Sequence, residues 1–242
     1  MIKPWSQTKH YLHSRLNMAS YDFYLDRKEV DNQIHVLEYY QIYEDRTFKI
    51  YTDIIEPYNE RVQGWGSING AIAFNNIENI IKKINPFPYS VTPHIDTLKF
   101  YSMDTCIHAN QILQAYKSLE QINDPNTTNA TIDLFALKFR EQFESNILPL
   151  YQKYSDQKVV YEEIICKYPI MGEEITGPYG IYDFISGDGN DIKLRILLFL
   201  YLYKDQRLHD FIHWLNKIYS EKEEFYKKHK VKLGLLLKEL NI

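Results

Sequence analysis

Two histidine pairs are the residues whose types and spacing come nearest to a metal site. His209 and His213 stand four residues apart in a predicted helix, a spacing with which two imidazoles can bind one zinc ion. A zinc-protease motif needs Glu directly after the first histidine, and this chain has Asp210 there. His10 and His13 form a second pair. Because no third ligand stands at usable spacing, we expect no metal, no cofactor and no catalytic residues.

The two cysteines of the chain, Cys106 and Cys166, exclude a disulfide framework and a four-thiolate zinc site. Cys106 stands two residues before His108, inside a helix predicted over residues 105–122. Residues two apart on a helix face different directions, so this pair is not expected to act as a nucleophile and its base. No serine occupies a nucleophile-elbow pattern either.

Two glycine-rich segments approach the patterns of ligand loops without matching them. Residues 187–191 resemble the start of a calcium loop, but the twelfth position counted from Asp188 is Phe199 instead of Glu. We therefore expect Asn190 or Asp191 to cap a helix. Residues 64–70 lack the Lys of a phosphate-binding loop and the spacing of a dinucleotide fingerprint, so they predict a turn and a bulge beside a strand.

Charge is distributed unevenly along the 242 residues, whose overall net charge is −4. Residues 22–60 carry ten acids against four bases, and residues 171–191 carry five acids and no base. Residues 217–238 are basic instead, with seven Lys against three Glu. The overall charge argues against general nucleic-acid binding. An acidic surface with interleaved Tyr suits a basic protein partner, because complementary potentials speed the encounter.

The acidic, glycine-rich segment 171–191 is one candidate interface, and the acidic segment 22–60 is the other. A long segment without a clear helix or strand pattern is often functional. Carboxylates on it could occupy a basic active site, while aromatic rings supply contact area. The residues predicted to bind the partner are Glu173, Glu174, Tyr179, Tyr182, Asp183 and Asp188.

The N-terminal part of the chain has the residue alternation of β-strands. Phe48, Ile50, Thr52 and Ile54 alternate with their neighbours in the clearest case, and the polar residues 44–46 predict a hairpin turn before it. A short helix with Ile77, Ile80, Ile81 and Ile84 on one face follows, capped by Asn75 or Asn76. The expected strands cover residues 20–25, 33–43, 47–56, 67–74 and 98–103.

The rest of the chain predicts helices, as do residues 4–18 at its start. The helix over residues 192–203 is apolar nearly all round, which predicts the most buried helix of this half. The next helix, over residues 205–229, has one apolar stripe that includes Phe211 and Leu215. The remaining expected helices cover residues 105–122, 131–148 with an end at Pro149, 155–166 and 233–240.

These elements predict an α+β fold: a mainly antiparallel sheet with flanking helices in residues 1–103, then a helical half in residues 104–242, together one continuous domain. The longest apolar run, residues 196–203, is far shorter than the ~20 residues that cross a bilayer. The N-terminal residues contain no apolar stretch of signal-peptide type. We therefore expect a cytoplasmic protein without membrane association; its oligomeric state is left open.

The joint between two predicted helices has a familiar order. Residues 147–151 read Ile-Leu-Pro-Leu-Tyr, and Tyr-Ser-Asp follows at 154–156. Together with the strand pattern at 33–56, this resembles a family of uncharacterised bacterial α+β domains, some of them regarded as immunity proteins of polymorphic toxins. The resemblance supplies no catalytic residues. It implies a protein that neutralises a toxin by direct binding.

Two alternative functions stay open at this point. One is a metal-dependent hydrolase or nuclease that would use His209 and His213. The other is a phage-derived or structural accessory protein that associates with itself.

Overall fold

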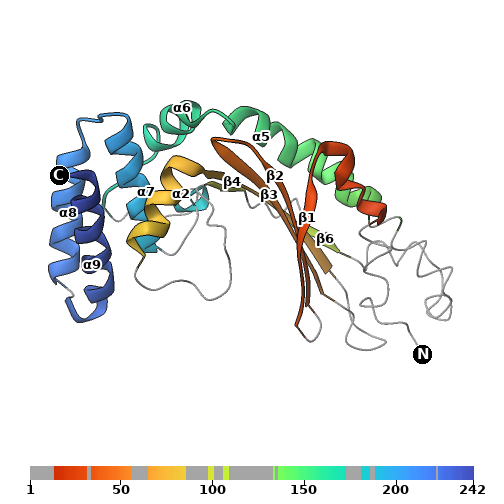
Figure 1. Ribbon diagram of the computed structural model, residues 1–242, viewed down its shortest axis with the longest axis horizontal. Helices are drawn as coiled ribbons and strands as arrows, with labels where there is room; N and C mark the ends of the chain where they lie inside the picture. The colour runs from red at the N-terminus through yellow and green to blue at the C-terminus, as the bar shows by residue number, and fades with distance from the viewer. Residues whose placement is uncertain are drawn as a thin grey trace. The chain divides into compact units, whose positions relative to one another are not determined.

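The computed structural model describes residues 14–31, 34–55, 65–85, 98–100, 106–108, 133, 136–172, 181–185, 189–221 and 223–242. The chain divides into two compact units that interleave along the sequence. One unit combines Met1–Ile42, Phe48–Gly70 and Phe100–Gln152; the other combines Tyr43–Thr47, Ala71–Lys99 and Lys153–Ile242. Figure 1 labels the elements of both.

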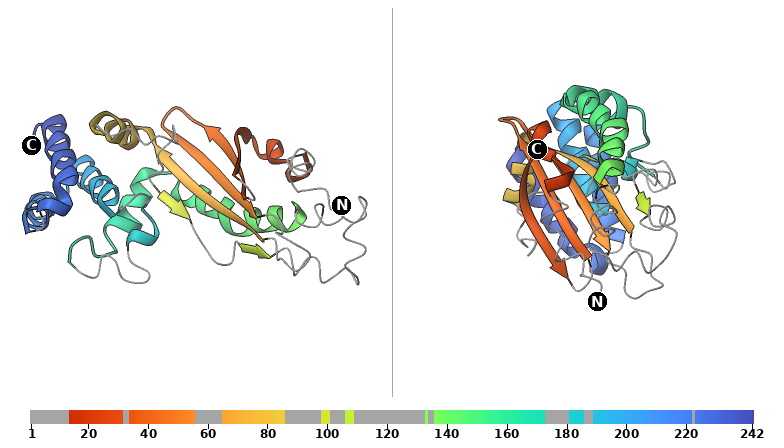
Figure 2. Two further views of the ribbon diagram at one scale, coloured as in Figure 1. Left: turned by 90° about the horizontal axis from the view of Figure 1, so that it is seen from below. Right: turned by 90° about the vertical axis from the view of Figure 1, so that its right-hand side faces the viewer.

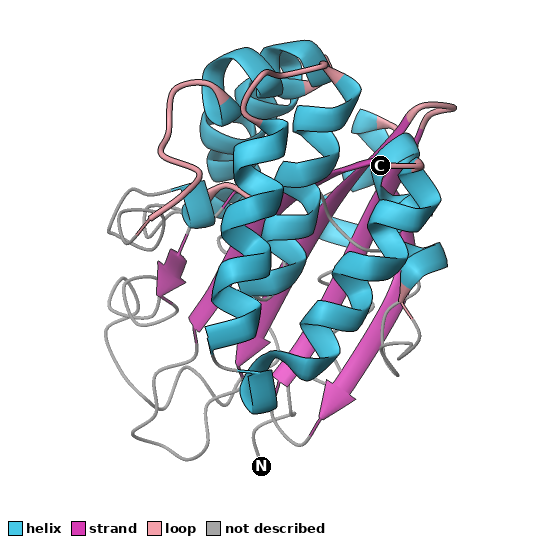
Figure 3. Cartoon of the chain, turned by 90° about the vertical axis from the view of Figure 1, so that its left-hand side faces the viewer, coloured by secondary structure: helices cyan, strands magenta, loops and turns pink. Residues whose placement is uncertain are grey.

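The strands, which differ in length, form one sheet in the N-terminal part of the chain, and most helices come after them in the sequence. This arrangement confirms the predicted α+β layout. That residues 1–103 and 104–242 share one continuous domain stays a prediction. The strand order in the sheet is β1-β2-β3-β4-β5, with β6 paired to β4. The long strands lie side by side in Figure 3. Their bounds are β1 Tyr24–Asp31, β2 Ile34–Ile42, β3 Arg46–Ile55, β4 Trp65–Phe74, β5 Leu98–Phe100 and β6 Cys106–His108.

Strands β1 and β2 pair antiparallel, with Tyr24 opposite Tyr40 and Asp31 opposite Ile34. The register shifts between Leu25 and Arg27, as at a bulge. Strand β6 pairs antiparallel with the start of β4. The helix predicted over residues 105–122 is therefore wrong at residues 106–108, which form a strand. The helical argument against a Cys106–His108 pair does not apply to a strand.

Aromatic packing holds the first unit together. The helical segment from residue 136 lies alongside the strands in Figure 2, and it places Tyr151 on Phe48 with ring centroids 4.6 Å apart and nearly parallel. The Tyr151 hydroxyl donates a hydrogen bond to the Lys49 carbonyl. Phe143 meets Phe23 edge-on at 5.9 Å, next to the short helix η1 (Met18–Tyr21).

The helix predicted to end at Pro149 does not end there. It passes through a π-helical turn, η4 (Phe143–Ile147), and continues as α5 (Leu148–Tyr154). Proline removes one backbone donor and its ring collides with the preceding turn of a regular helix. The wider π turn directly before Pro149, in which the Leu148 N–H bonds the Phe143 carbonyl, gives the ring room.

The second unit is built around α7 (Gly189–Leu202), which packs against α2 (Asn75–Ile84), η5 (Tyr161–Ile165), α8 (Leu208–Glu221) and α9 (Glu223–Leu240). The helices α2, α7, α8 and α9 lie together in Figure 1. Every residue from 191 to 200 is buried. Among the helices that the structure describes in this half, α7 is therefore the most buried, as predicted. The short helices α6 (Gln157–Val160) and η7 (Ile181–Asp183) complete the unit.

Three charged side chains of α7 are buried together with its apolar ones. Arg195 is fully buried, and its Nε and Nη2 atoms donate to the two carboxylate oxygens of Glu78 on α2, each at 3.0 Å. Asp191 accepts from Lys232 on α9 at 2.9 Å, and both residues are buried. Lys193 lies 5.9 Å from the ring centroids of three aromatic residues, Trp214, Tyr219 and Tyr226. Paired charges therefore connect α7 to its neighbours.

Three expectations about helix ends in this unit are wrong. A single helix was predicted over residues 205–229, but the structure has two helices there, α8 and α9. The two helices pack on each other, and each presents an apolar face to the core. Helix α7 begins at Gly189, which places Asn190 and Asp191 inside its first turn. The N-cap of α2 is Phe74, and Asn75 makes other contacts. The helix start predicted at residue 155 agrees with the structure to within two residues: α6 begins at Gln157, and the Asp156 carboxylate caps it by accepting from the Lys158 N–H.

No described helix is both long and apolar enough to cross a bilayer. The helix predicted over residues 4–18 lies mostly outside the described residues, of which 14–16 are helical.

The two ion pairs of α2 give a matched test of burial. Replacing Arg195 with Met should cost about 3–5 kcal/mol of unfolding free energy, because Glu78 is left charged and buried. The double replacement of Arg195 and Glu78 with Met should recover most of that loss. Lys83 forms an ion pair with Glu239 at 2.6 Å, and 65% of the Lys83 side chain is exposed. Replacing Lys83 should therefore cost under about 1 kcal/mol of unfolding free energy. Urea unfolding measures all three, and equal costs at Arg195 and Lys83 would contradict the assignment.

Candidate functional site

The turn between β2 and β3 lies in the acidic segment 22–60 and combines exposed acids with an exposed aromatic ring. We call residues Tyr43–Arg46 the hairpin tip. Tyr43 is 38% exposed, and its neighbours Glu44 and Asp45 are exposed as well. The Tyr43 N–H donates to the Arg46 carbonyl at 2.8 Å, which closes a two-residue turn and confirms the predicted hairpin. An exposed ring beside carboxylates is typical of a protein-binding surface.

Neither turn residue, Glu44 nor Asp45, has the positive φ that two-residue hairpins prefer. The first residue of α2 supports the turn instead. The Asn75 N–H donates to the Asp45 carbonyl at 2.9 Å, and the Asn75 side-chain amide donates to the Glu44 carbonyl at 2.7 Å. Sequence analysis missed this role, because Asn75 before an apolar helix has the pattern of a cap.

Arg46 holds the side chains of the hairpin tip. Its Nη1 atom donates to both carboxylate oxygens of Asp45, at 2.9 and 2.8 Å, and its guanidinium lies 4.7 Å from the centroid of the Tyr43 ring. Guanidinium groups commonly stack on aromatic faces. The backbone and the aromatic ring are thus fixed before a partner arrives, while Glu44 adds an exposed carboxylate. Such pre-organisation lowers the entropy cost of binding.

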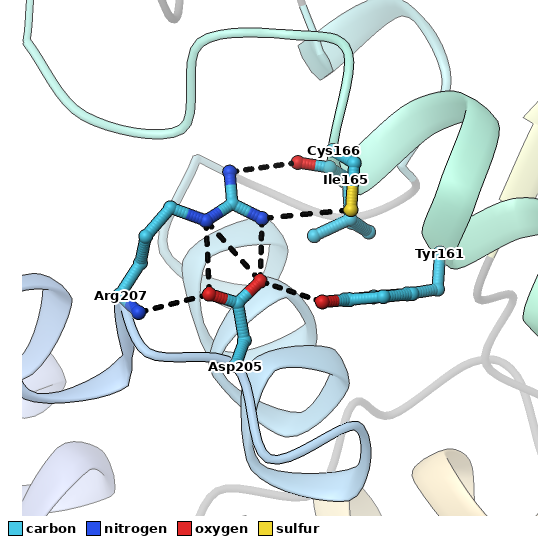
Figure 4. A network of polar contacts seen from close by, with 5 residues as sticks. All are labelled: Tyr161, Ile165, Cys166, Asp205 and Arg207. Carbon is cyan, nitrogen blue, oxygen red and sulfur yellow. Dashed lines mark hydrogen bonds and ion pairs between the residues drawn. The ribbon is translucent and has the colours of Figure 1, made fainter.

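A second polar cluster lies where η5 meets the connection between α7 and α8 (Figure 4). Asp205 accepts from the Tyr161 hydroxyl at 2.8 Å and from the Arg207 Nη2 atom at 2.6 Å. Arg207 also donates to the Ile165 carbonyl at 3.3 Å and lies 3.8 Å from the Cys166 sulfur, an exposed free thiol. The Arg207 N–H donates to Asp205 at 2.8 Å, which fixes the turn before α8.

Two side chains of this cluster have pKa values that lie far from neutral pH. The hydrogen bond from Arg207 lowers the pKa of Asp205 to about 2. Burial, together with the hydrogen bond to Asp205, raises the pKa of Tyr161. A general acid or base works best with a pKa near the working pH, so the Asp205–Tyr161 pair suits a structural link between helices.

The structure describes only part of the predicted loop site. Glu173, Glu174, Tyr179 and Asp188 lie outside the described residues. Tyr182 and Asp183 are neighbours in η7, where Tyr182 is half-buried. Asp191, which the acidic segment 171–191 includes, is buried against Lys232 and belongs to the core. Glu38 of the other acidic segment is also buried, and it accepts from the Tyr40 hydroxyl.

Among the described residues, the fold brings no further ligand to the candidate metal residues. His209 and His213 are both exposed on α8. Within the part of the chain that the structure describes, no group of three or more His, Cys, Asp or Glu could hold a metal ion. His10 and His13 lie outside that part.

Compared with known proteins, the chain matches no family model, no curated protein and no solved structure. The resemblance to bacterial immunity-type domains therefore rests on the sequence pattern alone.

The Asp205 cluster predicts a pH-dependent stability. Replacing Asp205 with Asn should cost about 1–3 kcal/mol at pH 7, because a charge-assisted hydrogen-bond acceptor is lost. The folded pKa lies below the unfolded value of about 3.9, so this contribution is complete above about pH 5 and disappears as the pH falls toward 2. Urea unfolding of both proteins at several pH values measures it. The matched change Glu162→Gln, at an exposed carboxylate, should leave stability within about 0.5 kcal/mol; an Asp205 effect that is constant from pH 7 to 2 would contradict this role.

Proposed function

We propose that this chain is a protein-binding protein whose partner presents a basic surface. The observation that carries the proposal is the hairpin tip, where Tyr43, Glu44 and Asp45 are exposed while Asn75 and Arg46 hold them in place. A fixed aromatic ring can serve as an anchor at an interface, and acids around it steer a basic partner into position. The acidic segment 171–191 would extend the same preference for positive charge.

The most specific form of this proposal is a bacterial immunity protein that works in the cytoplasm. Its partner would be a toxin domain that cuts nucleic acid, since such an active site must be basic to hold phosphate. Carboxylates of the chain would cover that site and exclude the substrate. The sequence resemblance at residues 147–156 and the acidic, Tyr-containing segments support this form.

The test replaces the exposed groups of the tip and leaves its supports in place. The probe is a nuclease toxin domain that the wild-type chain binds. Tyr43→Ala combined with Glu44→Lys should weaken this binding at least tenfold, because an anchor and a favourable charge are lost. The affinity of the wild-type chain should fall as salt rises, and that of the variant should fall less. Glu162→Lys is the matched control, since it makes the same charge change at an exposed carboxylate of the same unit.

Calorimetry measures the affinities, and the nuclease activity of the toxin domain measures neutralisation. Unchanged affinity of the tip variant would remove the hairpin tip from the proposal. A second variant, with Glu173, Glu174, Asp183 and Asp188 changed to Lys, would then show whether the loop carries the binding. Binding without loss of toxin activity would contradict the immunity role and leave a protein-binding role.

A further inference from the structure

The longest helix of the second unit exposes one continuous stripe of mixed character. Seven exposed residues of α9 lie on one side of the helix, with one or two of them in each successive helical turn. We call these residues the α9 stripe. At its centre lie Val231 and Leu235, which are 49% and 39% exposed. The opposite face of α9 carries the buried residues Leu233, Leu236 and Leu240. The α9 stripe consists of Glu224, Lys227, Lys228, Val231, Gly234, Leu235 and Lys238.

Two residues of the α9 stripe are poor choices for a helix that faces only water. Both residues lower helix stability relative to Ala. Gly234 does so because glycine loses more backbone freedom when the helix forms, and Val231 because its branched side chain is restricted to few rotamers in a helix. Within the part of the chain that the structure describes, nothing requires the glycine, since a Cβ atom built there would meet no atom within 4 Å. A local choice that costs stability without an evident gain is expected where a surface has a function.

A glycine in the middle of an exposed helix allows another backbone to approach closely. Val231 lies three residues before Gly234 and Leu235 directly follows it, so a side chain from a second helix could pack at Gly234 beside both apolar side chains. A lipid surface would gain nothing from the missing Cβ atom, and two apolar side chains offer it little area. The arrangement therefore favours a protein helix as the occupant.

The charges of the α9 stripe decide which helix fits. Three Lys flank the apolar centre against one Glu. A second copy of the chain that packed its own α9 there would bring a net charge of +2 against the same net charge, and like net charges oppose docking. An acidic helix would place opposite charges around the apolar contact.

We propose that the α9 stripe is a docking site for an acidic amphipathic helix of a partner protein. This surface differs in charge from the hairpin tip and would serve a second contact, either with another partner or with an acidic helix of the same one. The inference does not depend on the proposed function, since it rests only on residues of α9.

Defined probes test the inference. We would measure, by fluorescence anisotropy at low salt, the binding of a synthetic amphipathic helical peptide with Glu on its polar face. A second peptide carries Lys at the same positions. The Glu peptide should bind the full chain at least tenfold more tightly than the Lys peptide. Equal binding of the two peptides, or no binding of the Glu peptide, would overturn the proposal.

Substitutions on α9 then assign the binding to the stripe. Gly234→Ala should raise the Tm of the free chain by about 2–4 °C, yet weaken the Glu peptide at least fivefold, because the added methyl group fills the gap. Lys227→Glu should also weaken it, whereas Lys217→Glu on α8, with 67% of its side chain exposed, should not. A Gly234→Ala chain that is more stable and binds equally well would contradict the docking site.

If the proposal fails, two further measurements would show what occupies the α9 stripe instead. Sedimentation of the wild-type chain and of Leu235→Lys would show self-association that depends on the stripe. Vesicles containing phosphatidylserine would show lipid binding. Either result, in a chain that does not bind the Glu peptide, would replace the acidic helix with that occupant.

Discussion

The pair between Arg195 and Glu78 is the constraint on which the second unit depends. A buried guanidinium is tolerated only when a charged partner meets it with good geometry, and here both carboxylate oxygens of Glu78 do so at 3.0 Å. This contact fixes α2 against α7. The pair between Asp191 and Lys232 fixes α9 against the same helix. An otherwise apolar core helix thus specifies its neighbours through its few charges.

Helix α2 carries this constraint to the surface. Glu78 and Asn75 stand three residues apart in its first turn, so one helix end holds both the buried pair and the hairpin tip. The tip has no favourable hairpin turn of its own and takes its shape from the two Asn75 hydrogen bonds. In this account, the rigidity of a surface contact at Tyr43 originates in a charge pair in the core. The Asp205 cluster links η5 and α8 in a comparable way.

Local patterns in the sequence predicted much of this fold. Alternation found the strand of residues 46–55 and its turn, a helix start was expected close to where α6 begins, and the apolar residues of 192–203 marked the central helix. Contacts between distant residues could not be predicted in this way. Arg195 and Glu78 are 117 positions apart, and an isolated Arg in an apolar run signals only that some partner must exist. The role of Asn75 and the passage of a helix through Pro149 also depend on surroundings that spacing does not reveal.

Above all, we infer that α2 pre-organises the hairpin tip before any partner binds. Amide hydrogen exchange of the free wild-type chain tests it most directly, read at the N–H groups of Tyr43 and Asn75, which donate to Arg46 and Asp45. We expect both amides to be protected nearly as strongly as the amides of α7, because the turn and the core open together. Exchange of these two amides at the rate of an unstructured peptide, while α7 stays protected, would contradict it.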